Sequence, residues 1–391
     1  MSTDDNSEKR YAGRPTSRKK FLQDGAALAG SLVGASALAG CGSSSSSGSS
    51  APTSAPAAAA PTIHPKVDGD INFLTFAEYI PPDVVTAFEK KYGVKVNQSF
   101  YSTQPEMVTK MATNEPIDLV LSDSAPMPQL LAGNLLQAFD MNDLKNADQL
   151  DGYFKAPWWD NGKYRYSVPY GAGPTGIMWR KDKVKNLTNT WNDIFDHPEA
   201  NGHIYLLSQQ GDTMGMALVK NGYSCNSGDP AEVQKATQSL LDLKPNVAKF
   251  TTDLGPVIAS GDAYLMEGWT TQIYQGLVQA KDPSLVGFSV PPTGPLLACD
   301  CLSVGVNAQA PGTALLFMDW MMRYDNNYKL GEFTLQRTGG KGGDAAYEKA
   351  IGAYPAFNYD KAIFNSPKNW KINPTGARLA LWNQSWSQVI A

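Results

Sequence analysis

Short apolar strand patterns alternate with amphipathic helix patterns along this chain, and no other feature of the sequence constrains its fold as strongly. Residues 71–76 are typical of a strand, and residues 81–92 are typical of a helix with Val84, Val85 and Phe88 on one face and Gly93 at its end. Strands separated by helices pair in parallel, so the pattern predicts an α/β fold with mainly parallel sheets. The other predicted strands are 94–101, 117–121, 175–179, 204–207, 262–266, 286–290 and 302–306, and the other predicted helices are 104–112, 127–131, 191–195, 213–221, 231–243, 270–280 and 313–324.

The alternation pauses between residues 153 and 176, a stretch rich in aromatic residues, Gly and Pro. We interpret the pause as a division of the chain into two α/β lobes, with the break near residue 172. Open α/β sheets bind their ligands at the carboxyl ends of the strands. The expected binding site is therefore a cleft between the two lobes.

The first 41 residues have the order of a secretory signal: the basic segment Arg18-Lys19-Lys20, an apolar run over residues 21–39, and small residues around Cys41. Leu38-Ala39-Gly40-Cys41 resembles a bacterial lipobox, in which the Cys thiol is lipidated and becomes the mature N-terminus. The alternative is a free Cys beside a transmembrane helix, but the run is short and rich in Gly for a membrane span. Residues 17–22 resemble a twin-arginine export motif with Lys in the second Arg position, and general secretion is the other route.

Residues 41–66 consist mainly of Ser, Ala, Pro and Gly and predict a flexible tether. We expect the protein to be exported and held at the outer face of the cell membrane by lipidated Cys41. Residues 67–391 are long enough for two lobes. The chain has 33 Lys+Arg against 37 Asp+Glu, a balance that argues against nucleic acid as a partner.

The sequence offers little for metal or covalent chemistry. Cys225, Cys299 and Cys301 remain after Cys41, and an exported protein permits a disulfide, but the sequence does not decide whether they pair. No His lies near the Cys pair in sequence, so we expect no metal site and no cofactor. The chain shows no G-x-S-x-G motif, zinc-type His pair or phosphate loop, so we expect no enzyme, while a glycosidase with paired carboxylates stays open.

A set of segments matches one known family in order along the chain: Phe73-Leu74-Thr75-Phe76-Ala77-Glu78-Tyr79-Ile80-Pro81-Pro82, Ile117-Asp118-Leu119-Val120, Ser167-Val168-Pro169-Tyr170-Gly171, Thr175-Gly176, Gly222-Tyr223-Ser224, Asp229-Pro230 and Pro245-Asn246-Val247-Ala248. From about residue 71 to residue 354 the chain resembles the spermidine/putrescine-binding proteins of ABC importers. The resemblance implies a two-lobe periplasmic-binding-protein fold of type II, in which each lobe is a mainly parallel sheet flanked by helices and the chain crosses between the lobes twice. By this analogy lobe one is 67–172 and 301–361, lobe two is 173–300 and 362–391, and the signal peptide is 1–40.

A polyamine presents ammonium groups separated by methylenes, so its site needs carboxylates at intervals and aromatic walls between them. The resemblance implies such roles for Asp300, as the carboxylate that contacts a ligand amine, and for Phe76 and Tyr79, as walls. Asp212 matches a second acid of the family, although an Asp at a helix start is also a common N-cap. The full set of candidate ligand-binding residues is Phe76, Glu78, Tyr79, Asp123, Asp212, Glu267, Trp269, Asp300 and Tyr354.

Several positions depart from the family pattern. Glu267 stands where the family usually has Trp, and Ala125 and Ala298 replace aromatic residues. The ligand is therefore expected to be putrescine, spermidine, an acetylated or amino-acid-like amine, or another organic cation. A sugar, an iron complex or an anionic amine is the alternative on the same scaffold, and the acids argue against an anion. The implied partners are the permease subunits of an ABC transporter, and we expect a monomer.

Overall fold

The computed structural model describes residues 63–77, 79–155, 157–159 and 164–391 of the chain. The predicted signal peptide, Cys41, most of the tether and Glu78 lie outside the described residues. The strands are β1 Ile71–Thr75, β2 Val96–Phe100, β3 Leu119–Asp123, β4 Phe139–Asp140, β5 Tyr164–Arg165, β6 Val168–Arg180, β7 Ile204–Leu206, β8 Val247–Phe250, β9 Leu265–Trp269, β10 Val286–Ser289 and β11 Leu296–Val304. The α-helices are α1 Pro82–Tyr92, α2 Gln104–Met111, α3 Met127–Ala132, α4 Gln210–Lys220, α5 Pro230–Leu243, α6 Gly255–Ser260, α7 Thr270–Gln279, α8 Pro311–Met322, α9 Tyr324–Thr334, α10 Lys341–Ala353 and α11 Gly376–Ile390.

The main sheet of the described residues has the strand order β2-β1-β3-β11-β6-β9-β7-β8, and β10 also pairs with β6. The strands at its two ends are parallel: β1 pairs with β2 and β3, and β7 pairs with β8 and β9. The strands in the middle, β11 and β6, pair antiparallel with their neighbours. The predicted α/β class with parallel strands is therefore confirmed, with an antiparallel centre that joins the two parallel sets.

Side chains of β1 and β3 alternate between two cores, as strand geometry requires. Phe73 and Leu119 point into one core with residues of α1 and α8, whereas Leu74 and Val120 point into the other with residues of α2 and α3. β1 and β3 are thus covered by helices on both faces, which explains why Phe73, Leu74, Leu119 and Val120 are all apolar. The end strand β2 is exposed after Val96 and carries polar residues.

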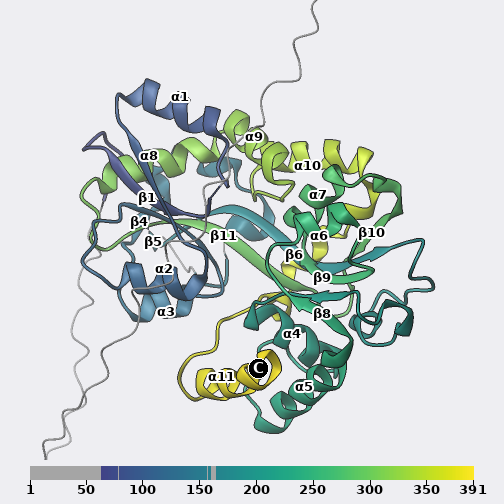
Figure 1. The fold of residues 1–391 in the computed structure, drawn as a ribbon. Coiled ribbons are helices and arrows are strands. Elements are labelled where there is room, and N and C mark those ends of the chain that lie inside the picture. The colour runs from purple at the N-terminus through teal and green to yellow at the C-terminus, as the bar shows by residue number, and fades with distance from the viewer. Residues whose placement is uncertain (1–62, 78, 156, 160–163) are drawn as a thin grey trace, which may run out of the picture. The chain divides into compact units, whose positions relative to one another are not determined.

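The second parallel set is built in the same way. Ile177 and Leu265 belong to a core shared with α4, α5 and α11, whereas the next residues along their strands, Met178 and Met266, belong to a core shared with α6 and α7. Figure 1 shows α11 beside α5, close to the C-terminus. The C-terminal helix therefore completes the core around β7 and β9.

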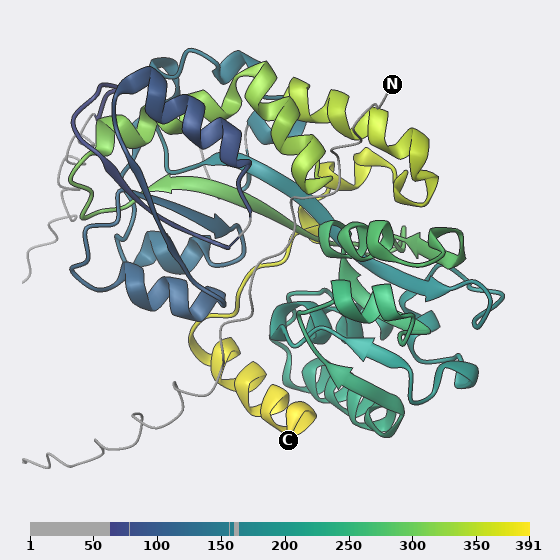
Figure 2. The same ribbon diagram turned by 45° about the horizontal axis from the view of Figure 1, so that its top comes forward.

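The Gly- and Pro-rich stretch near residue 172, where the alternation in the sequence pauses, is part of the continuous strand β6. Figures 1 and 2 show β6 and β11 as long strands that lie side by side. Glycine is required here by close packing: a Cβ on Gly176 would lie 2.6 Å from the ring of Phe288. The small residues here serve contacts between neighbouring segments, so the pause in the sequence pattern does not mark the end of a strand.

Two boundary shifts matter for the site. The strand predicted at 117–121 is β3, Leu119–Asp123, so Asp123 is the last residue of a strand. The strand predicted at 262–266 is β9, Leu265–Trp269, so Glu267 lies inside a strand rather than after it. α1 ends as predicted, because Gly93 adopts the left-handed conformation with φ 70°. In the part of the chain that the structure describes, none of the helices has both the length and the apolar character of a membrane span.

Candidate functional site

The first part of the site forms where β1 ends. Tyr79 follows β1, and its hydroxyl donates a hydrogen bond of 2.5 Å to Oδ2 of Asp300 on β11. Two further groups hold the tyrosine in place: the hydroxyl of Tyr170 donates to its backbone carbonyl at 2.6 Å, and Nε2 of Gln336 donates to its hydroxyl oxygen at 2.7 Å. Segments far apart in the sequence thus fix one tyrosine against one carboxylate.

The position of Asp300 depends on an irregularity in the pairing of β6 with β11. Asp300 pairs with Gly171, but the next residue of β11, Cys301, pairs with Pro169, so Tyr170 is the extra residue of a bulge. Gly171 is needed here because a Cβ at this position would meet Oε1 of Gln336, whose Nε2 lies 3.4 Å from Asp300 Oδ2. The bulge and the glycine together make room for the polar side chains around Asp300.

Asp123 and Asp300 stand directly opposite each other on β3 and β11. Opposite residues of paired strands project to the same face of the sheet, so the two carboxyl groups lie next to each other on that face. Burial, followed by the charge of Asp123, raises the pKa of Asp300 to about 7. Burial also raises the pKa of Asp123, although nearby Lys371 and the backbone N–H of Ala125 oppose the shift. Such a pair gains most from a cation placed between its members.

The second part of the site surrounds Asp212 at the start of α4. Its Oδ1 accepts hydrogen bonds from Thr175 Oγ1 at 2.6 Å, from Trp269 Nε1 at 3.1 Å and from Lys371 Nζ at 2.5 Å. Asp212 and Lys371 are both almost fully buried, at 5% and 6% exposed. Burial would lower the pKa of Lys371, but Asp212 and Asp123 raise it above its ordinary value, so the pair is ionic.

Glu267 is fully buried in β9, close enough to Asp212 for the charge of Asp212 to act on it. Its Oε2 accepts hydrogen bonds from Thr213 Oγ1 at 2.7 Å and from the backbone N–H of Leu207 at 3.2 Å, whereas its Oε1 is a buried atom without a hydrogen-bond partner among the described residues. Burial, followed by the charge of Asp212, raises the pKa of Glu267 to about 8. The carboxyl group is therefore mostly protonated at neutral pH and ties the end of β7 to the start of α4.

Glu267→Gln should leave the free energy of unfolding at pH 4 within about 1 kcal/mol of the wild type, because the carboxyl is then mostly protonated in the folded and the unfolded state and Gln has the shape of a protonated carboxyl. The folded pKa of Glu267 lies above its ordinary value of 4.5, so the wild-type protein loses stability progressively as the pH rises from about 4.5 to about 8. The variant has no proton to lose and should be more stable than the wild type at pH 9. Urea unfolding at both pH values, with exposed Glu115→Gln as the control, tests this, and an equal loss at both would contradict it.

Aromatic side chains line the Asp300 part of the site. The ring of Phe76 lies 5.7 Å from that of Tyr79 and 4.4 Å from that of Tyr101, and the rings of Tyr79 and Tyr170 are 5.8 Å apart, measured between centroids. Tyr354, at the end of α10, packs edge-on against Tyr274 of α7 at 5.2 Å. The hydrogen bonds described above among the acids do not include Tyr354.

The structure brings most of the predicted site residues together. Around two carboxylate centres it places Phe76 and Tyr79, Asp123 and Asp300, and Asp212 with Trp269 and Glu267. Sequence reasoning missed Lys371, Gln336, Tyr170 and Thr175. Lys371 and Gln336 gave no local signal, whereas Tyr170 and Thr175 belonged to segments already singled out as similar to the family.

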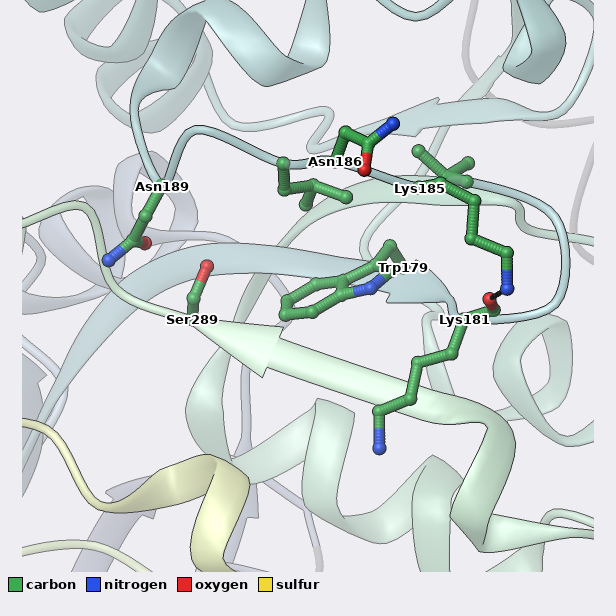
Figure 3. Close-up of a pocket in the computed structure, with 8 residues that line it drawn as sticks. Trp179, Lys181, Lys185, Asn186, Asn189 and Ser289 are labelled. Atoms are coloured by element: carbon green, nitrogen blue, oxygen red, sulfur yellow. Dashed lines mark hydrogen bonds between the residues drawn. The ribbon is translucent and has the colours of Figure 1, made fainter.

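Among the described residues, no group of three or more His, Cys, Asp or Glu side chains is arranged to hold a metal ion. Cys225, Cys299 and Cys301 are buried. A surface hollow of 570 Å³ lies beside β6 and β10, where Trp179, Lys181, Lys185 and Asn186 contribute to its wall (Figure 3). Its two lysines make it a poor place for a cation. We therefore assign the candidate site to Asp123, Asp212, Glu267 and Asp300, called the acid cluster below.

Comparisons of the chain with family models, with curated proteins and with solved structures all match solute-binding proteins. The family model described as "Bacterial extracellular solute-binding protein" matches residues 83–341. The "Spermidine/putrescine-binding periplasmic protein" of Salmonella typhimurium is 30% identical over 268 residues, which make up 67% of this chain and 75% of that protein. The "Putrescine/cadaverine-binding protein" of Pseudomonas aeruginosa is 26% identical over 257 residues, which make up 63% of this chain and 72% of that protein.

The structure titled "Putative spermidine/putrescine ABC transporter from Listeria monocytogenes" superposes with a TM-score of 0.74 at 24% identity, covering 82% of this chain and 99% of that one. At this identity the likeness shows the fold alone. It confirms the predicted fold class, the two-lobe α/β arrangement of periplasmic binding proteins.

Proposed function

The chain belongs to the family of bacterial extracellular solute-binding proteins, and from that premise we propose that it is the receptor of an ABC importer for an aliphatic amine. Putrescine and spermidine are the reference amines for testing this proposal, since relatives are named for binding them. The proposal places the amine between the predicted lobes, against Asp123 and Asp300.

One observation carries the proposal: two partly buried carboxyl groups face each other without a salt bridge to a cationic side chain of the described residues. Carboxylates so close repel each other, and the raised pKa of Asp300, about 7, reflects that repulsion together with burial. An ammonium between them would remove the repulsion and gain two charge-assisted hydrogen bonds. A carboxylate ligand would add a third negative charge, which argues against an anion.

The aromatic residues support the same ligand. Phe76, Tyr79 and Tyr170 form a wall beside Asp300. Flat rings pack against methylene groups and attract cations through their faces. An aliphatic amine offers both groups, whereas a sugar would need more hydrogen-bonding partners than this wall provides.

The proposed setting is extracytoplasmic. Relatives are named as periplasmic proteins, and residues 38–41 resemble a lipobox. In this proposal lipidated Cys41 and the tether of residues 41–66 keep the folded receptor close to its permease while the lobes open and close. The role is binding and delivery rather than catalysis.

Calorimetric titration of residues 67–391 with putrescine, spermidine, a neutral sugar and a dicarboxylate tests the proposal. We expect saturable binding of at least one amine at one site per chain and no heat from the sugar or the dicarboxylate. Absence of binding to every amine at millimolar concentration would refute the amine function.

Amine affinity should fall by about tenfold or more between pH 8 and pH 5.5, because a proton on Asp300 competes with the ammonium. The pKa of the Asp300 carboxyl is about 7, so it is mostly ionised at the higher pH and mostly protonated at the lower, while an aliphatic amine stays charged throughout. Titrations at intermediate pH values should follow one apparent ionisation near 7. Affinity that stays level or rises toward low pH would contradict this assignment.

A further inference from the structure

Lys371 brings an ammonium group of the protein itself into the acid cluster. The backbone N–H of Lys371 donates to the carbonyl of Leu297 at 3.0 Å, and that of Asn373 donates to the carbonyl of Ala125 at 3.0 Å. These two bonds fix the segment beside the start of β11 and the residues that follow β3. The lysine is therefore held in place from both sides and is only 6% exposed.

The two centres of the cluster differ in what neutralises them. Asp212 has a cation of its own, since Lys371 Nζ lies 2.5 Å from its Oδ1. Asp300 and Asp123 accept hydrogen bonds from neutral groups: the Tyr79 hydroxyl, the Gln336 amide, the Ser124 hydroxyl and the Ala125 backbone. The charge of Lys371 also acts on Asp123, but its salt bridge is with Asp212, so the Asp123–Asp300 pair is the centre at which a cation from outside is needed.

Two further groups of the cluster have hydrogen-bonding capacity left. Among the described residues, the Lys371 ammonium donates one hydrogen bond, to Asp212, although it has three protons. Oε1 of Gln336, beside Asp300, is a buried acceptor without a partner in the same part of the chain. An ammonium near Asp300 could donate to that oxygen, and an acceptor near Lys371 could receive its remaining protons.

Building on the amine-binding function proposed above, we infer that this site selects amines with a single ammonium group over diamines, because Lys371 occupies the position of a second cation. The ammonium of the ligand binds between Asp123 and Asp300. The other end of the ligand meets the Lys371 ammonium, which repels a second positive charge and favours a hydrogen-bond acceptor such as an amide oxygen.

Putrescine and N-acetylputrescine form a matched pair for the test, because they share the four-carbon chain and differ in whether the second nitrogen is charged. Calorimetry at pH 7.5 should show N-acetylputrescine binding to the wild type about tenfold tighter than putrescine, or more. Lys371→Gln should reverse the order, because Asp212 then lacks a cation and can pair with the second ammonium. Lys371→Arg keeps the charge and should keep the wild-type order.

Lys371→Gln leaves a buried carboxylate unpaired, so the double variant Asp212→Asn/Lys371→Gln provides a folded alternative, checked by circular dichroism. It should bind both amines with affinities within about threefold of each other. A wild type that prefers putrescine, or an order that Lys371→Gln leaves unchanged, would overturn the inference while amine binding itself stands. If the wild type binds neither amine, the proposed function fails as well.

Discussion

Asp300→Asn should weaken amine binding by about 100-fold or more. The substitution keeps the size of the side chain but removes the negative charge, and truncating one partner of a buried charge pair costs about 2–5 kcal/mol of binding free energy. The Asn side chain can still accept the hydrogen bond of the Tyr79 hydroxyl, which is 2.5 Å long in the wild type. The folded structure should therefore survive the change.

The control for this variant is Asp242→Asn, which removes an exposed carboxylate on α5. It should bind the amine as the wild type does. Without ligand, Asp300→Asn should be at least as stable as the wild type at pH 8, because it relieves the repulsion with Asp123. Unchanged affinity in a well-folded Asp300→Asn protein would remove Asp300 from the site.

Lys371→Met should lower the free energy of unfolding at pH 7.5 by about 3–5 kcal/mol, because it leaves the carboxylate of Asp212 buried without its counter-ion. Asp212 is 5% exposed, so water cannot replace the ammonium easily. Urea unfolding of the ligand-free protein measures the loss. No ligand is involved, so the prediction depends on the geometry alone.

The double variant Asp212→Asn/Lys371→Met separates the ion pair from the packing of the lysine stem. It removes both charges and should recover at least half of the loss seen in Lys371→Met. A double variant as unstable as the single one would assign the effect to packing. A stable Lys371→Met protein would show that Asp212 has another source of charge compensation.

The strands and helices of the two parallel sets could be predicted because their chemistry is local. Phe73 and Leu74 are both apolar and point to opposite cores, which is the pattern of a strand covered on both faces. Gly93 ended a helix where expected, since glycine adopts the left-handed conformation easily. Asp123 was found because it follows such an apolar strand, whereas Tyr79 and Asp300 were found because the resemblance to the family implied their roles.

The rest of the site depends on contacts between distant segments. Lys371 lies 159 residues from Asp212 in the sequence, in a stretch whose periodicity gives no hint of burial. Glu267 was expected at the end of a strand, but it lies inside β9 with its carboxyl bonded to Thr213 and Leu207. Pairing across the sheet also made a strand of the Gly-rich residues around 172. Single-sequence patterns carry none of this information.

A crystal structure of the protein with a bound amine tests the proposed site most directly. Density for the ligand is expected with its ammonium nitrogen about 3 Å from a carboxylate oxygen of both Asp123 and Asp300 and its methylenes against Tyr79. An amine bound away from both carboxylates, or paired with Asp212 after displacing Lys371, would contradict it.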